Sequence, residues 1–162
     1  PTQIVEKYLS WANDYQENQI TILYDTMWDG TKRMAEAITK GIREIDKKVN
    51  VKLYHIAKTD KNDIITEIFK SRIILVGSPT IGGGILSGVA EILEMIKGMR
   101  FKNKKAASFG CYGWSGESIK VIKEHLEKSS FSVINDGIRA LWNPDEESLE
   151  KCVEFGREIA NS

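Results

Sequence analysis

Ile20-Thr-Ile-Leu-Tyr-Asp-Thr-Met-Trp-Asp-Gly-Thr-Lys-Arg-Met34 joins a short apolar run to an amphipathic pattern through a polar turn. Residues 20–24 are mostly apolar and β-branched or aromatic, which is typical of a strand buried inside a sheet. From Thr31 onward the spacing becomes helical, and one stripe carries Met34, Ile38, Ile42 and Ile45. The segment therefore predicts a buried strand followed directly by a helix.

The turn between this strand and helix is a candidate phosphate site. It consists of Thr26, Met27, Trp28, Asp29, Gly30 and Thr31. The start of a helix offers unpaired N–H groups and the positive end of the helix dipole, both of which suit a phosphate. Thr26 and Thr31 add hydroxyl donors, and Gly30 permits a close backbone approach. An ordinary turn with Thr31 or Asp29 as the N-cap explains the same residues, so this segment alone leaves both interpretations open.

Size and charge exclude several classes of protein. A chain of 162 residues predicts one domain with a single substantial core. Its 23 basic and 23 acidic residues balance, which argues against a nucleic-acid binder or a membrane-surface protein that relies on bulk charge. No apolar run of about 20 residues predicts a membrane span, and no secretory signal is visible. Two cysteines, Cys111 and Cys152, fit a reducing cytoplasm. Because the chain begins with Pro1, we interpret it as a processed product or a piece of a longer protein.

Strand and helix patterns alternate along the rest of the chain. Four further strands are expected at 49–55, 72–78, 105–110 and 131–142, the last with a break at Asp136-Gly137. Helical spacing occupies residues 2–14 and the stretches between the strands, and Asn143-Pro144-Asp145 opens a last helix. The pattern predicts an α/β fold: a doubly wound, five-stranded parallel sheet with helices on both faces. We divide the chain into an N-terminal helix or connector (1–18) and one domain (19–162).

The first, third and fourth strands each end in an unusual loop. The third strand leads into Ser78, Pro79, Thr80, Ile81, Gly82, Gly83 and Gly84. The fourth leads into Cys111, Tyr112, Gly113, Trp114, Ser115, Gly116 and Glu117. A parallel sheet brings the carboxyl ends of its strands to one edge, so the three loops should meet there. Hydroxyls and amides beside aromatic side chains predict a pocket for a planar, nucleotide-like ring. Trp142, in contrast, is expected in the core.

Other site types fit this fold poorly. The order of Gly30, Thr31 and Lys32 does not match a phosphate-binding Walker loop, and the first turn lacks the three glycines of a dinucleotide fingerprint. Neither His55 nor His125 belongs to a metal-ligand motif, and we interpret both as surface or satisfied core residues. The surroundings of Ser115 lack the nucleophile-elbow spacing of a hydrolase.

The three loops together resemble the FMN loops of flavodoxins, over residues 19–161. Their motifs Tyr24-Asp-Thr-Met-Trp28, Ser78-Pro-Thr-Ile81 and Tyr112-Gly-Trp-Ser-Gly-Glu117 are similar to those in the flavodoxin-like C-terminal domain of flavo-diiron proteins, the oxygen and nitric oxide reductases. The segment Ile4-Val-Glu-Lys-Tyr-Leu-Ser-Trp-Ala12 is similar to the connector that leaves the diiron domain. This resemblance implies a flavodoxin-like strand order, 2-1-3-4-5.

The resemblance also implies FMN as the cofactor and assigns roles to the loops. The first loop, residues 26–31, would hold the phosphate. Residues 78–83 would border the isoalloxazine ring, and Cys111, Tyr112, Gly113, Trp114 and Gly116 would close its other side. A rubredoxin-like iron protein would donate electrons, a diiron domain outside this chain would accept them, and copies of the full-length protein would pair. The balanced charge and the three consecutive glycines depart from the usual pattern of the family.

Three alternatives remain open at this stage. A stand-alone flavodoxin-type electron carrier would use the same loops without a diiron partner. A flavodoxin-like module without cofactor would only contact other proteins. A reductase acting alone on a quinone or NAD(P)H is a weaker alternative, since the chain has no pyridine-nucleotide fingerprint.

Overall fold

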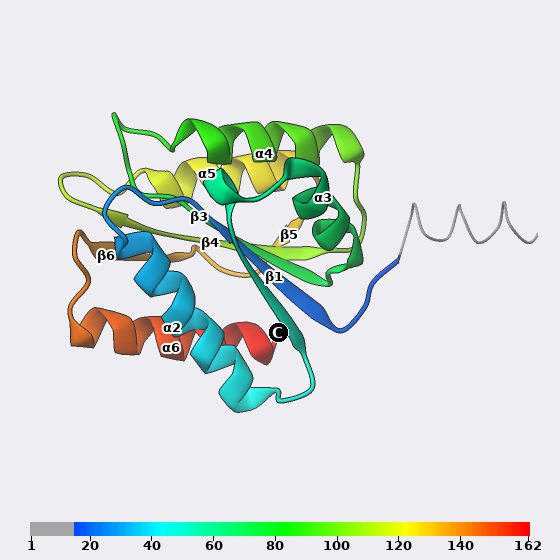
Figure 1. Ribbon diagram of the computed structural model, residues 1–162, viewed down its shortest axis with the longest axis horizontal. Coiled ribbons are helices and arrows are strands. Elements are labelled where there is room, and N and C mark those ends of the chain that lie inside the picture. The colour runs from blue at the N-terminus through cyan, green and yellow to red at the C-terminus, as the bar shows by residue number, and fades with distance from the viewer. Residues whose placement is uncertain (1–14) are drawn as a thin grey trace, which may run out of the picture.

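A parallel sheet runs through the middle of the part of the chain that the computed structural model describes, residues 15–162 (Figure 1). Its strands are β1 (Gln19–Tyr24), β2 (Asn50–His55), β3 (Ile73–Gly77), β4 (Lys105–Tyr112), β5 (Ser132–Val133) and β6 (Ile138–Leu141). They follow the order β2-β1-β3-β4-β5, with β6 also pairing with β4, and every pairing is parallel. The predicted strand order and fold class are confirmed. The predicted helix at 2–14 lies outside the described residues.

The fifth strand position holds two short strands in place of one continuous strand. β5 pairs with the start of β4 at Lys105 and Ala106, whereas β6 pairs with its end, from Phe109 to Tyr112. Between them, the Asn135 side chain accepts a hydrogen bond from the Gly137 amide, and Gly137 has a φ of 86°. This local turn interrupts the pairing with β4 after Ala106, and the pairing resumes at Phe109. The predicted break at Asp136-Gly137 is therefore confirmed.

Helices cover both faces of the sheet. One layer contains α2 (Gly30–Ile45) and α6 (Glu146–Ala160); the other contains α3 (Lys61–Lys70), α4 (Ser87–Met99) and α5 (Ser118–Lys128), and a short 3-10 turn, η1 (Ile56–Lys58), precedes α3. Figure 1 shows the two layers on opposite sides of the strands. Because β1 and β3 lie between both layers, all of their residues are buried.

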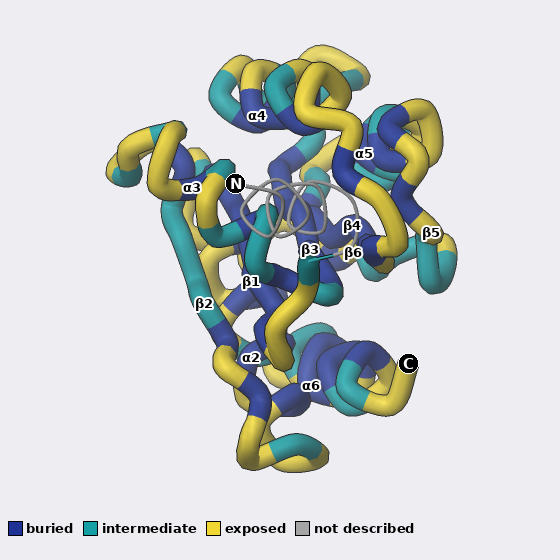
Figure 2. Tube along the Cα trace, turned by 90° about the vertical axis from the view of Figure 1, so that its right-hand side faces the viewer, coloured by how far each residue is buried: buried dark blue, intermediate teal, exposed yellow. Residues whose placement is uncertain are grey.

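Each layer closes its own hydrophobic core against the sheet. The stripe predicted on α2 is buried at Met34, Ile38 and Ile42, but Ile45, at the end of the helix, is 45% exposed. On the other face, Val89, Ile92, Leu93 and Ile96 of α4 are buried, as their spacing predicts. Figure 2 shows the buried strands between helices whose outer sides are exposed. No helix among residues 15–162 has the length and apolar character needed to cross a bilayer.

Candidate cofactor site

The three predicted loops meet at the carboxyl edge of the sheet, around a hollow of about 240 Å³. Its wall consists of Met27, Trp28, Gly30, Pro79, Thr80, Ile81, Cys111, Tyr112, Gly113 and Trp142. Nine of these ten residues belong to the loops that the sequence singles out. Segments far apart in the chain are thus brought to one rim by the parallel strands β1, β3 and β4.

The first loop leaves the start of α2 without a side-chain cap. Asp29 occupies the N-cap position with a left-handed φ of 62°, yet its carboxylate makes no capping hydrogen bond. By contrast, α3 and α6 are capped by Asp60 and Asp145. The capping role considered for Asp29 is therefore absent, and the first-turn amides of α2 are open to an anion.

Thr31 and Gly30 connect this loop to the end of β4. Thr31 is fully buried, and its Oγ1 lies 3.2 Å from the Sγ of Cys111. A methyl group at Gly30 would lie 3.1 Å from the same sulfur and 3.4 Å from Pro144. Thr26 is half-buried. The first loop thus packs directly on Cys111, and the Thr31 hydroxyl is engaged by its sulfur.

The second loop is a tight turn fastened by its own hydroxyls. Ile81 and Gly84 exchange two backbone hydrogen bonds, and the residues between them, Gly82 and Gly83, have φ values of 54° and 75°. Two successive positive φ values are the type I′ pattern that glycine adopts readily. Ser78 is fully buried: its Oγ donates to the carbonyl of Pro79 and accepts from the amide of Leu86. Ser78 therefore shapes the loop from below and does not line the hollow.

Thr80 joins the second loop to the third. Its amide donates to the carbonyl of Cys111 over 2.9 Å, and its Oγ1 accepts from the amide of Ser118 at the start of α5. In the third loop, Tyr112 lies under the Arg139 guanidinium, 5.5 Å from the ring centroid. Gly116 packs against the same arginine. These contacts hold the second and third loops in a fixed relation to each other.

Trp142 is a site residue that sequence reasoning misplaced. It was expected in the core, but it is 56% exposed and lines the hollow. Its amide donates to the carbonyl of Tyr112, so it directly continues the last paired residues of β6 and β4. The available signal was its position: Trp142 follows a parallel strand, and the rule that placed the other loops at this edge places it there too.

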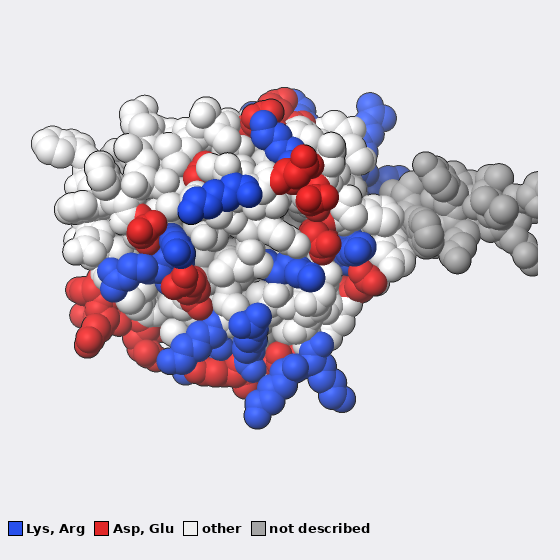
Figure 3. All heavy atoms as spheres, viewed as in Figure 1, with Lys and Arg blue, Asp and Glu red and all other residues white. Residues whose placement is uncertain are grey.

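Exposed apolar side chains gather at this rim. Among residues 15–162, six of the eight large exposed hydrophobic residues lie there: Met27, Trp28, Ile81, Trp114, Leu141 and Trp142. Trp114 is 98% exposed and Trp28 is 72% exposed, although contact of such large apolar side chains with water is unfavourable in free energy. In the view of Figure 3, the upper left edge, where these loops lie in Figure 1, is largely uncharged. A contiguous exposed apolar surface of this kind indicates a binding site.

The arrangement fits FMN. Open helix amides suit its phosphate, and apolar and aromatic walls suit its ring. A hollow of about 240 Å³ is smaller than typical small-molecule pockets, which occupy roughly 300–1,000 Å³. A ring held there would consequently stay partly exposed between the tryptophans.

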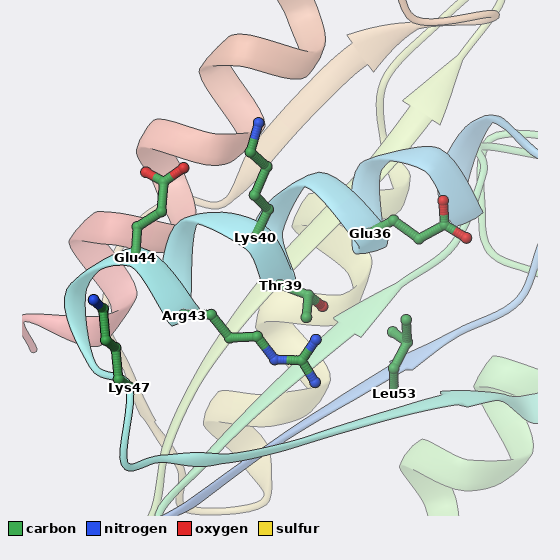
Figure 4. A pocket seen from close by; sticks show the side chains of 7 residues that line it. All are labelled: Glu36, Thr39, Lys40, Arg43, Glu44, Lys47 and Leu53. Atoms are coloured by element: carbon green, nitrogen blue, oxygen red, sulfur yellow. The ribbon is translucent and has the colours of Figure 1, made fainter.

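A larger hollow, of about 540 Å³, lies between α2 and β2 and has a different character. Figure 4 shows that its wall is made mainly of long charged side chains from α2, with Leu53 contributed by β2. One of these side chains, Glu44, is already engaged with Arg157 at 2.8 Å. This surface lacks aromatic residues and the strand-end loops, so size alone does not make it the cofactor site.

Comparisons with known proteins agree with this geometry. Residues 22–156 match the flavodoxin family. The anaerobic nitric oxide reductase flavorubredoxin of Klebsiella pneumoniae is 46% identical over 160 residues, which are 99% of this chain and 33% of that protein. Among solved structures, rubredoxin oxygen:oxidoreductase from Desulfovibrio gigas has 34% identity and a TM-score of 0.91, with 99% of this chain and 39% of that one covered.

A flavodoxin from the domain Archaea is also similar, with 28% identity and a TM-score of 0.79 over 88% of this chain and 96% of that one. The chain thus spans about a third of the length of its flavorubredoxin relatives but nearly the whole of a small flavodoxin. The family match covers every predicted loop and most of the fold. The chain therefore belongs to the flavodoxin family, whose members bind FMN and transfer electrons.

Proposed function

We propose that this chain is the electron-transfer domain of a flavo-diiron reductase, and that it passes electrons from a small rubredoxin-like iron protein to a diiron centre on another domain. The observation that carries this proposal is the 46% identity to one third of a flavorubredoxin, together with an intact rim at the corresponding end of the sheet. In the full-length protein we expect the terminal acceptor to be nitric oxide or oxygen, the substrates that the relatives' names give.

The first loop would bind the phosphate. The amides at the start of α2, which no side chain caps, would donate to it, and the half-buried Thr26 would add its hydroxyl. The Thr31 hydroxyl contacts Cys111, so Thr31 would support the loop from beneath. Gly30 keeps the helix start close to Cys111. Met27 and Trp28 would shield the edge of the ring, and Asp29 would contribute its backbone only.

The second and third loops would enclose the ring. Pro79, Thr80 and Ile81 form one wall, while Tyr112, Gly113 and Trp142 form the other. Trp114, Gly82 and Gly83 are exposed and do not line the hollow; as members of the same loops, they would approach the ring from outside it. Gly116 and Ser78 would act beneath the surface, by fixing the shapes of their loops. Bound FMN would supply the capacity to accept and release single electrons.

The cellular setting follows from the same proposal. Cys111 and Cys152 are both free and buried. Burial raises the pKa of the Cys152 thiol to about 12, so it stays protonated and unreactive. Free thiols of this kind suit a reducing cytoplasm, where we place the protein.

Titration of the purified, flavin-free chain with FMN tests the cofactor part. We expect saturable binding of one FMN, seen as quenching of flavin and tryptophan fluorescence, because Trp28 and Trp142 line the hollow. The mixture should then be reducible by a reduced rubredoxin. Absence of any binding would overturn the assignment and favour a flavodoxin-like module without cofactor.

A second candidate, a stand-alone flavodoxin carrier, is favoured by the 96% coverage of a small archaeal flavodoxin. The mass of the native protein in its own cells separates the two functions. A species about three times as long as this chain supports the reductase, whereas a species of this chain's length supports the carrier.

A further inference from the structure

Asp25 is a buried carboxylate placed immediately before the first loop. Its side chain is 12% exposed, and its Oδ1 accepts a hydrogen bond from the Thr26 amide over 2.9 Å. The same oxygen lies 2.9 Å from Nε2 of His55. Its Oδ2 faces the start of α4, where a methyl group at Gly88 would lie 3.0 Å away. The carboxylate therefore holds the first amide of the loop while His55 holds the carboxylate.

His55 is itself held firmly in place. It is the last residue of β2 and is paired in register with Tyr24 of β1. Its ring stacks on the Tyr24 ring with 5.1 Å between centroids and 13° between planes. Its carbonyl accepts a hydrogen bond from the Thr59 hydroxyl. The imidazole is thus fixed by two strands and a turn, and its Nε2 is aimed at Asp25.

Charges of both signs surround this pair. Asp25 directly follows β1; the first loop adds Asp29 and α2 adds Glu36, both close enough to raise the pKa of Tyr24 after the larger effect of its burial. The cations are the exposed Lys58, in the turn after β2, and the exposed Lys32 and Arg33, in the first turn of α2. No lysine or arginine is among the residues that line the rim hollow. A phosphate bound at the start of α2 would therefore add charge to a region that already contains three carboxylates.

We propose that His55 and Asp25 form a positioning pair for the first loop, in which a proton on His55 offsets the Asp25 carboxylate and strengthens binding of the FMN phosphate. The inference rests on the proposed function, since it assigns the phosphate to this loop. Neutral His55 still donates a hydrogen bond to Asp25, so the loop keeps its shape at high pH. Protonated His55 adds a positive charge, and histidine changes its charge between about pH 5 and 8.

The test compares FMN dissociation constants at pH 6 and pH 8 in the wild type and His55→Gln. Glutamine can donate to Asp25 but cannot be protonated. We expect His55→Gln to weaken FMN binding about 5-fold or more at pH 6 but about 2-fold or less at pH 8. Taking the ratio of variant to wild type cancels the protonation of the phosphate itself. His125→Gln, in the last turn of α5, serves as the matched control and should leave both values unchanged.

Riboflavin, which lacks the phosphate, shows whether the effect of His55 acts on the phosphate charge or on the shape of the loop. For riboflavin the ratio of variant to wild type should be the same at both pH values. Equal FMN ratios at pH 6 and pH 8 would overturn the inference, and so would a riboflavin ratio with the same pH dependence. In either case FMN still binds, so the proposed function stands. Loss of FMN binding by the wild type would instead refute the proposed function together with the pair.

Asp25→Asn provides an independent variant in case His55→Gln does not fold. The asparagine oxygen still accepts from the Thr26 amide, but the charge is gone. We expect Asp25→Asn to bind FMN about 3-fold more tightly than the wild type at pH 8, because one negative charge near the phosphate is removed. Weaker binding by Asp25→Asn at pH 8 would contradict an electrostatic role for the pair.

Discussion

The amino end of the sheet buries polar side chains, whereas its carboxyl end exposes apolar ones. At the amino end, Nε2 of Gln19 donates to the Glu67 carboxylate over 2.7 Å and lies 3.2 Å from the hydroxyls of Thr21 and Ser71, which are themselves 2.6 Å apart. At the carboxyl end, tryptophans stand in solvent around the rim hollow. Both arrangements reverse the usual distribution of side chains.

This difference indicates which end of the sheet has its side chains satisfied by the fold alone and which end needs a ligand to cover them. Among the described residues, no buried side-chain nitrogen or oxygen lacks a hydrogen-bond partner, so the polar side chains buried at the amino end are satisfied within the fold. The exposed aromatic rings of the carboxyl end would be removed from water only when something binds there. We therefore interpret the amino end as structural and the carboxyl end as functional.

The largest expected effect on stability is that of Gly110→Ala, which tests how closely β4 is packed just before the rim. A methyl group at Gly110, inside β4, would lie 2.1 Å from the carbonyl oxygen of Ser78 and 2.8 Å from Oγ of Ser118. Gly110→Ala should lower the free energy of unfolding by about 3 kcal/mol or more, because backbone atoms must move apart. Urea denaturation measures this change.

Gly113→Ala is the matched control for Gly110→Ala, three residues further along. Its nearest neighbour for a methyl group is Cβ of Trp142 at 3.9 Å, an ordinary contact. The change in the free energy of unfolding should stay within about 0.5 kcal/mol. Similar losses in both variants would mean that the rim is packed as closely as the strands.

Lys104→Met should come next in size, because it breaks the network at the amino end. The Lys104 ammonium is buried and donates to the carbonyls of Tyr15, Phe69 and Ser71 over 3.2, 2.8 and 2.6 Å. Losing these bonds should lower the free energy of unfolding at pH 7 by about 2 kcal/mol. FMN affinity should not change, and the neighbouring exposed Lys105→Met should alter neither quantity.

The pH dependence of stability sharpens this prediction. Burial lowers the pKa of Lys104 from 10.5 to about 8 in the folded chain. Between pH 8 and 10.5 the unfolded chain therefore binds a proton that the folded chain does not, so stability rises with pH in this window. Relative to Lys104→Met, the wild type should gain about 2 kcal/mol between pH 7 and pH 10. A flat difference across that range would show that the carbonyls keep Lys104 charged.

Gly82→Ala should have a smaller effect, since only the backbone resists it. No atom lies within 4 Å of an added methyl group, but the φ of 54° is unfavourable for alanine. We expect the free energy of unfolding to fall by about 1 kcal/mol. In Gly82→Asn the free energy of unfolding should fall by less, because asparagine tolerates this conformation. Equal losses would indicate that the side chain, and not φ, disturbs the turn.

Trp114→Ala should have the smallest effect on folding. Its side chain is 98% exposed, so the free energy of unfolding should change by less than about 0.5 kcal/mol. FMN should nevertheless bind roughly 3- to 10-fold more weakly, as expected when one aromatic contact is lost. Met99, on α4, is also an exposed apolar residue, so Met99→Ala is the control and should change neither the free energy of unfolding nor FMN affinity. A stability loss without a loss of affinity would assign Trp114 to the structure.

Local patterns were sufficient for much of the fold. Period and composition located β1 and β3 and their following helices, because a buried parallel strand is apolar on both faces. The same reasoning brought the three loops to one edge. The same rule applies to Trp142, which directly follows β6, but its large aromatic side chain favoured the core when judged by residue type alone.

By itself, the sequence determined the alternation of elements, the strand-end loops and the family resemblance, because these depend on the order and spacing of residues. The tertiary structure alone decided which side chains touch across the sheet. The contact of Thr31 with Cys111 and the contact of His55 with Asp25 join residues 80 and 30 positions apart in the chain. Such contacts depend on the register of neighbouring strands, which no local pattern records.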